Sequence, residues 1–180
     1  MDMKAIQTFF NREDAFANHN GMTITEVREG YARSEMELQP YHLNGARTVH
    51  GGVLFTLADF AFAAASNSRG QLALSINSSI SIFKGAKQGK LIAEAREVSN
   101  APKLASFEVS IRNQAGDLLA TSLIKMLKER LDKRTGFRVK PGMSAKPGLG
   151  TRYCNELAPE QIYRAACRFC VAKRSIKGYT

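Results

Sequence analysis

Long apolar runs are absent from this sequence of 180 residues. No stretch reaches the roughly 20 apolar residues that a membrane-spanning helix needs. The first residues, Met1–Ala5, include an acidic side chain and lack the basic-then-apolar order of a signal peptide. We therefore expect a cytoplasmic protein that does not enter a membrane.

Cysteine and histidine are scarce, with three of each. The cysteines are Cys154, Cys167 and Cys170, and the histidines are His19, His42 and His50. The single C-x-x-C pair in the tail lacks the second pair that zinc sites usually have, and the histidines show no ligand spacing. The sequence thus predicts no metal and no other cofactor, and nothing before residue 131 depends on disulfides.

The net charge of +10 is unevenly spread along the chain. Residues 1–130 carry 15 Lys and Arg against 13 Asp and Glu, whereas residues 131–180 carry 11 against 3. A basic balance suggests nucleic acid or another polyanion, but here it is mostly confined to the last fifty residues. We expect one folded domain over 1–130 and a weakly ordered basic extension over 131–180, with nucleic-acid binding unlikely.

Hydrophobic periodicity divides residues 1–130 into helices and strands. Helical spacing predicts a short helix over 3–18, and the almost uniformly apolar stretch 51–66 predicts a buried helix. Strands are predicted at 22–28, 31–38, 72–83, 91–98, 104–112 and 118–127. One long helix among antiparallel strands indicates an α+β fold in which the sheet wraps round that helix.

The buried helix begins with His50-Gly51-Gly52. A helix N-terminus presents unpaired N–H groups and a partial positive charge, and glycine lets a ligand approach the backbone closely. These groups could hold the carbonyl oxygen of an ester-like substrate as an oxyanion hole. The alternative is that the glycines only allow a tight turn into the helix.

Asp59 lies within this otherwise apolar helix and is the only acidic residue between Glu37 and Glu94. A buried carboxylate is unfavourable unless it has a partner or faces a site. Perturbed buried acids are often catalytic, but a structural carboxylate held by backbone or hydroxyl donors would fit as well.

Taken together, the segment His42–Gly70 is more specific than any of its parts. It combines Asn44, His50-Gly51-Gly52, Asp59 eight residues after Gly51, and a helix end at Asn67 to Gly70. This pattern resembles that of PaaI-type hotdog-fold thioesterases, the phenylacetic-acid-degradation branch of the family. The resemblance covers about residues 3–128. It implies a hotdog fold and hydrolysis of an acyl-CoA, such as phenylacetyl-CoA or hydroxyphenylacetyl-CoA. The alternative is a hotdog protein that binds acyl-CoA without hydrolysing it.

The resemblance also implies how the residues divide the work. Active sites would lie between two protomers of a dimer or of a dimer of dimers, with a tetramer favoured. Gly51 would polarise the thioester carbonyl, while Asp59 of the opposite protomer would act as general base or nucleophile. Asn44, His50 and Ser75 would support the catalytic groups. The substrate would contact Gly52 and the lysines Lys84, Lys87 and Lys103, which could equally be solvated loop charges.

An acyl pocket is also expected, lined in part by helix residues. The resembling family often has an Arg-Pro or Ser-Pro pair where this chain has Lys84-Gly85, so details of CoA docking differ here. The aromatic side chains Phe55 and Phe62 are the candidates for the pocket wall.

Overall fold

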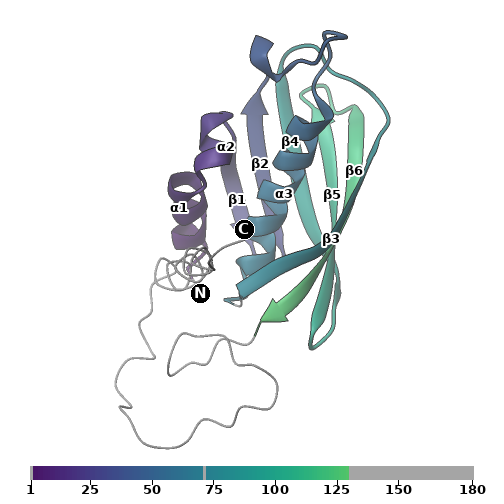
Figure 1. The fold of residues 1–180 in the computed structure, drawn as a ribbon. Helices are drawn as coiled ribbons and strands as arrows, with labels where there is room; N and C mark the ends of the chain where they lie inside the picture. Colours follow the sequence, from purple (N-terminus) through teal and green to yellow (C-terminus); the bar gives the residue numbers. More distant parts are fainter. Residues whose placement is uncertain (1, 71, 130–180) are drawn as a thin grey trace, which may run out of the picture. The chain divides into compact units, whose positions relative to one another are not determined.

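A six-stranded sheet curves around one long helix, with two short helices beside it (Figure 1). The structure is a computed structural model, and it describes residues 2–70 and 72–129. The helices are α1 (Met3–Glu13), α2 (Ala15–His19) and α3 (Gly51–Asn67), and a 3-10 turn spans Pro40–His42. The strands are β1 (Thr23–Arg28), β2 (Tyr31–Glu37), β3 (Leu72–Ile82), β4 (Lys90–Asn100), β5 (Leu104–Asn113) and β6 (Leu118–Glu129).

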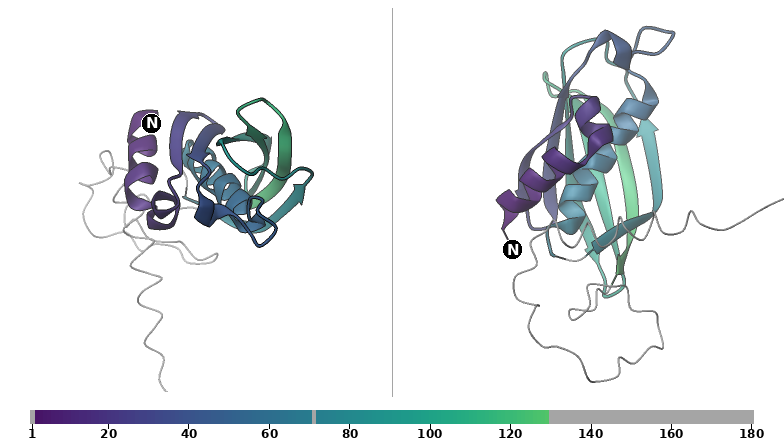
Figure 2. Two further views of the ribbon diagram at one scale, coloured as in Figure 1. Left: turned by 90° about the horizontal axis from the view of Figure 1, so that it is seen from above. Right: turned by 60° about the vertical axis from the view of Figure 1, so that its left-hand side comes forward.

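The sheet has the strand order β1-β2-β4-β5-β6-β3. The pairs β1–β2, β2–β4, β4–β5 and β5–β6 are antiparallel, as predicted. The long crossover through α3 carries the chain from β2 to the far edge, where β3 lies beside β6. The view from above in Figure 2 shows the sheet bending around α3. The expected α+β fold is therefore confirmed for the described residues.

Helix α3 is the centre of the core. Leu54, Leu57 and Ala61 are completely buried, and the Ser34 hydroxyl of β2 donates a 3.1 Å hydrogen bond to the Leu57 carbonyl oxygen. Its many alanines let the strands approach closely. Phe62 is also buried and packs edge-on against Phe107 of β5, with ring centroids 5.4 Å apart. Phe62 therefore belongs to the core, and our expectation that it lines an acyl pocket was wrong.

The single N-terminal helix that we predicted is divided in two at Asp14. The Asp14 carboxylate accepts a 2.9 Å hydrogen bond from the Ala17 N–H and so caps α2, while its own N–H donates to the Phe10 carbonyl at the end of α1. Asp and Asn favour N-cap positions because their side chains satisfy free backbone donors. The Phe10 ring lies edge-on to that of Phe60, which attaches α1 to α3.

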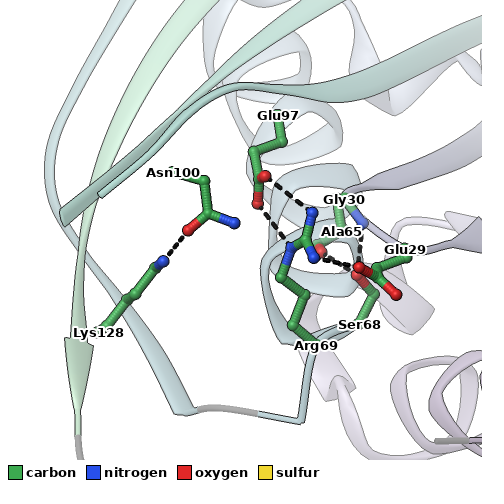
Figure 3. Close-up of polar contacts among 8 residues, drawn as sticks. All are labelled: Glu29, Gly30, Ala65, Ser68, Arg69, Glu97, Asn100 and Lys128. Carbon is green, nitrogen blue, oxygen red and sulfur yellow. Dashed lines mark hydrogen bonds and ion pairs between the residues drawn. The ribbon is translucent and has the colours of Figure 1, made fainter. Parts of the chain in front are cut away.

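The C-terminal end of α3 is tied to the turn between β1 and β2 (Figure 3). The Ser68 hydroxyl accepts a 2.8 Å hydrogen bond from the Gly30 N–H and donates a 2.6 Å bond to the Ala65 carbonyl oxygen. Gly30 has a φ of 68°, which favours glycine because it has no Cβ. Glu29 and Gly30 form the turn between the two strands predicted at 22–28 and 31–38, and this turn also anchors the helix.

Ion pairs reinforce the same end of α3 (Figure 3). The Arg69 guanidinium binds both carboxylate oxygens of Glu97 on β4 at 3.0 Å and also pairs with Glu29. Nearby, Lys128 of β6 binds Asn100 at the end of β4. The planar two-point contact between Arg69 and Glu97 fixes the geometry of the pair as well as contributing energy. Anchoring this end of α3 helps to fix the place of its other end.

Candidate active site

A tight loop, which we call the lead-in loop (residues 43–49), brings the chain to α3. Leu43 and Val49 form a β-bridge, and the Asn44 N–H donates a 2.8 Å hydrogen bond to the Thr48 carbonyl oxygen. The Asn44 side-chain oxygen accepts from the N–H groups of Ala46 (2.9 Å) and Thr48 (3.3 Å). The amide NH2 of Asn44 has no acceptor among the described residues, so it can donate to a ligand; its supporting role stays a prediction.

The first turn of α3 leaves one backbone donor free. His50 caps the helix, since its Nδ1 accepts a 2.9 Å hydrogen bond from the Gly52 N–H and its carbonyl oxygen accepts one from Val53. Within the described part of the chain, the Gly51 N–H has no acceptor, as expected at the first helical position. Gly51 can therefore serve as an oxyanion donor. Gly52 can offer a substrate close approach, but its N–H is already used.

Both glycines face close neighbours. A Cβ at Gly52 would lie 3.1 Å from His50 Nδ1, so glycine there lets the histidine cap the helix. A Cβ at Gly51 would lie 3.3 Å from Ile82 Cδ1, which shows that the end of β3 lies beside the start of α3. The geometry of the two glycines is thus compatible both with a tight turn into the helix and with a Gly51 N–H that is free to donate.

Asp59 is half-buried in the middle of α3, with no hydrogen-bond partner among the described residues. Burial raises the pKa of its carboxyl above the ordinary value, and the negative charge of Asp14 raises this pKa further. A carboxylate with a raised pKa is a better proton acceptor, as a general base requires. The other reading, a structural carboxylate held by nearby donors, finds no such donor in the described residues.

Within one protomer, Gly51 and Asp59 are too far apart to act on the same carbonyl. They are eight residues apart on one helix, which at 1.5 Å per residue is about 12 Å along its axis. Reacting groups must lie about 3 Å from a shared substrate atom. The two groups can meet at one thioester only if they come from different copies of the chain.

Ser75 lies on the exposed edge strand β3 and makes no side-chain hydrogen bond with the described residues. It precedes Ile82, the neighbour of Gly51, by seven residues, which is roughly 23 Å along an extended strand. The structure therefore does not bring Ser75 together with the Gly51 of its own protomer.

The predicted lysines fall into two groups. Lys84 and Lys87 are exposed on the loop after β3, which packs on the lead-in loop because the Val49 N–H donates a 2.7 Å bond to the Ala86 carbonyl oxygen. Lys84 also pairs with Asp117 at 2.9 Å. Lys103 is exposed in the turn between β4 and β5, at the far end of the sheet, where its carbonyl oxygen accepts from the Lys128 N–H. Only the first two lie near the start of α3.

Two further residues, Gly85 and His42, shape this region, although neither was predicted to belong to the site. Gly85 approaches the Thr48 hydroxyl so closely that any Cβ would overlap it, which accounts for a glycine at the position where the resembling pattern has proline. His42 is only 2% exposed, and its Nδ1 accepts a 3.0 Å bond from the Gln39 N–H. The only sequence signal for His42 was its place two residues before Asn44.

No grouping of three or more potential metal ligands occurs among the described residues. In that same part of the chain, no helix is long and apolar enough to cross a membrane.

Comparison with known proteins gives this geometry a family context. Residues 46–120, which hold the second half of the lead-in loop and all of α3, match the Thioesterase superfamily. A protein of Archaeoglobus fulgidus, provisionally named as an esterase, is 42% identical over 119 residues, which are 66% of this chain and 77% of that protein.

The acyl-coenzyme A thioesterase PaaI of Escherichia coli K12 is 34% identical over 56% of this chain and 73% of its own. The solved structure of E. coli PaaI, from the phenylacetic acid degradation operon, superposes with a TM-score of 0.68 over 70% of this chain and 92% of that one, at 30% identity. A hypothetical thioesterase of Streptococcus pneumoniae TIGR4, solved with coenzyme A, has a TM-score of 0.61 at 25% identity and covers 71% of this chain and 96% of its own. From these relatives and the shared architecture, the chain belongs to the Thioesterase superfamily, as a PaaI-type hotdog protein and a thioester hydrolase.

Proposed function

We propose that this protein hydrolyses acyl-CoA to the free acid and CoA, in a site that two protomers build together. The observation that carries this proposal is the separation of about 12 Å between Gly51, with its free N–H, and Asp59, with its unpartnered carboxylate. Each is suited to one half of thioester hydrolysis, and neither can complete the reaction within its own chain. PaaI, one of the relatives, is named as an acyl-coenzyme A thioesterase.

In the proposed mechanism, the Gly51 N–H of one protomer donates to the thioester carbonyl oxygen. Asp59 of the other takes a proton from water while the water oxygen bonds to the carbonyl carbon, and the developing oxyanion rests on the Gly51 N–H. The tetrahedral intermediate then collapses, the C–S bond breaks, and the thiolate of CoA receives the proton from Asp59. Alternatively, the Asp59 carboxylate attacks the carbonyl carbon directly, the C–S bond breaks and CoA leaves as the thiolate, and water then hydrolyses the mixed anhydride to the free acid and the Asp59 carboxylate, with the released proton going to the thiolate.

The remaining predicted residues would support these two groups. The free amide NH2 of Asn44 can donate to the water or to the carboxylate of Asp59. His50 holds the first turn of α3 through the Gly52 N–H, which keeps the Gly51 donor in place. Ser75 would join from the second protomer, because the structure holds it far from the Gly51 of its own chain.

The second protomer would add along β3, one of the two edge strands of the sheet. Leu74, Ile76 and Ile82 on this strand are 47%, 57% and 49% exposed, and β3 pairs with a neighbour on one side only. An exposed apolar edge strand is a template for pairing with another chain. We propose a dimer through this edge and, following the resemblance, its further association into a tetramer.

The substrate we favour is an aryl-acetyl-CoA. PaaI of E. coli is described as coming from the phenylacetic acid degradation operon, and the S. pneumoniae relative was solved with coenzyme A. Phe55, 39% exposed on α3, can provide an apolar wall for the acyl group. Lys84 and Lys87 lie beside the start of α3 and can meet CoA phosphates, whereas Lys103 could do so only for the site of another protomer.

A thiol-release assay tests this function. The full-length protein is supplied with phenylacetyl-CoA, hydroxyphenylacetyl-CoA and straight-chain acyl-CoAs of increasing length, with the Asp59→Asn variant as the matched control. We expect the highest kcat/KM with an aryl-acetyl-CoA and loss of turnover in the variant. Faster hydrolysis of a straight-chain substrate would reject the acyl preference, and binding of CoA esters without release of thiol by the wild type would reject hydrolysis.

Residues 131–180 lie outside the described residues, so their separation as a basic extension stays a proposal. DNA retention that depends on salt and is lost on deleting them would assign such binding to the extension.

A further inference from the structure

His42 combines deep burial with one used and one unused ring nitrogen. The ring is 2% exposed, and Nδ1 accepts a 3.0 Å hydrogen bond from the Gln39 N–H. In the neutral ring, the proton must therefore be on Nε2, and this N–H is buried without a hydrogen-bond partner among the described residues. The unpaired Nε2–H is unfavourable, but an apolar side chain would instead leave the Gln39 N–H without its acceptor. The useful atom of the imidazole is therefore Nδ1, which closes the 3-10 turn at the base of the lead-in loop.

The backbone of His42 joins the side chain to the start of α3. Its carbonyl oxygen accepts a 2.9 Å hydrogen bond from the His50 N–H, next to the bridge between Leu43 and Val49. The backbones of His42 and His50 are thus hydrogen-bonded to each other across the base of the lead-in loop. His50 in turn accepts from the Gly52 N–H at 2.9 Å. The free donor of Gly51 lies between these fixed points.

We propose that His42 is a positioning residue for thioester hydrolysis: by holding the Gln39 N–H at Nδ1, it fixes the base of the lead-in loop and so the direction of the Gly51 N–H. This inference rests on the proposed function and adds a residue to it. Burial lowers the pKa of His42, which keeps the ring neutral and Nδ1 able to accept at neutral pH.

Two conservative variants separate the two nitrogens. His42→Asn places an amide oxygen near the position of Nδ1, so it can still accept from the Gln39 N–H, but it has nothing at Nε2. His42→Gln places its amide near Nε2 and loses the acceptor at Nδ1. Misplacing a catalytic donor by about 1 Å can cost on the order of a hundredfold. We therefore expect kcat for His42→Gln to lie about tenfold to a hundredfold below that for His42→Asn, with little difference in KM. A Gln variant at least as active as the Asn variant would overturn the proposal.

A double-mutant cycle tests whether His42 acts through Gly51. His42→Gln is combined with Gly51→Ala, which keeps the backbone N–H, and with Gly51→Pro, which removes it. We expect the histidine substitution to lower kcat in the alanine background and to have no further effect in the proline background, because the donor it places is gone. The same fold-loss in both backgrounds would overturn the proposal, and thermal unfolding of each variant controls for the fold.

A readout independent of catalysis completes the test. Nitrogen NMR of the wild-type protein labelled at histidine should show His42 with a bare Nδ1 and a protonated Nε2, and the reverse tautomer would contradict the inference. A wild type without thioesterase activity would contradict the proposed function. An active wild type with an additive cycle would contradict only the role of His42.

Discussion

Removal of the Gly51 N–H is the perturbation that isolates the oxyanion donor. Gly51 occupies the first helical position of α3, where proline is favoured because no intrahelical hydrogen bond is lost. The preceding residue, His50, has φ −67° and ψ 135°, which is the conformation that proline imposes on its predecessor. Gly51→Pro can therefore delete one N–H with the helix intact.

Gly51→Ala is the matched control. Alanine and proline both place a Cβ 3.3 Å from Ile82 Cδ1, so both variants experience the same contact while only proline lacks the donor. The contact is tight but involves the end of a flexible side chain, so we expect similar losses of about 1 kcal/mol in unfolding free energy. Any difference in turnover between the variants then reports the replacement of the N–H by the Cδ of the proline ring.

The expected difference follows from the strength of such donors. Removing one oxyanion-hole donor typically lowers kcat by about 100-fold to 1000-fold, or roughly 2.7–4 kcal/mol of transition-state stabilisation. We expect the proline variant to fall below the alanine variant by this factor in a thiol-release assay, with a smaller change in KM. Equal kcat values in two folded variants would refute the role of the Gly51 N–H.

Four further substitutions test the Asp59 carboxyl, the contact between Gly85 and Thr48, and the β3 edge. Asp59→Asn should raise the free energy of unfolding at neutral pH, measured by urea unfolding. Because the pKa of Asp59 is raised in the fold, the folded state binds the proton more tightly than the unfolded chain does. Wild-type stability therefore falls as pH rises through that pKa. This advantage should shrink on acidification, and a less stable variant at pH 7 would contradict the raised pKa. Gly85→Ala should lower both Tm and kcat because its Cβ displaces Thr48. Adding Thr48→Ala should restore part of both. A Gly85→Ala variant with wild-type Tm and kcat would show that the close approach of Gly85 to Thr48 is unimportant. Ile76→Lys should shift the protein toward monomer in light scattering and lower activity in parallel, and a fully active monomer would reject the shared site.

Much of the fold could be predicted because periodicity and burial coincide. The apolar stretch after Gly51 is a helix surrounded by strands, and the alternation of Phe107, Val109 and Ile111 in β5 matches their buried faces. The break at Asp14 could not be predicted, since an Asp can lie inside a helix or cap one, and here its carboxylate caps α2 by accepting from the Ala17 N–H.

In the candidate site, too, some features could be predicted from the sequence and others could not. The helix N-terminus and the isolated carboxylate were visible as residue types, and their spacing along one helix is fixed once that helix forms. The capping of Gly52 by His50 and the use of His42 Nδ1 depend on side-chain direction, which no local pattern specifies. The burial of Phe62 was missed because an apolar helix gives no sign of which aromatic faces the sheet and which faces a substrate.

The shared site is tested most directly by mixing two inactive variants. Homodimers of Gly51→Pro lack the oxyanion donor and homodimers of Asp59→Asn lack the base, but a hybrid dimer contains one site with both native groups. After unfolding and joint refolding at equal amounts, half of the dimers should be hybrids with one working site each, giving about one quarter of the wild-type rate. A mixture as inactive as its components would show that Gly51 and Asp59 must act within the same chain, and would contradict the two-protomer site.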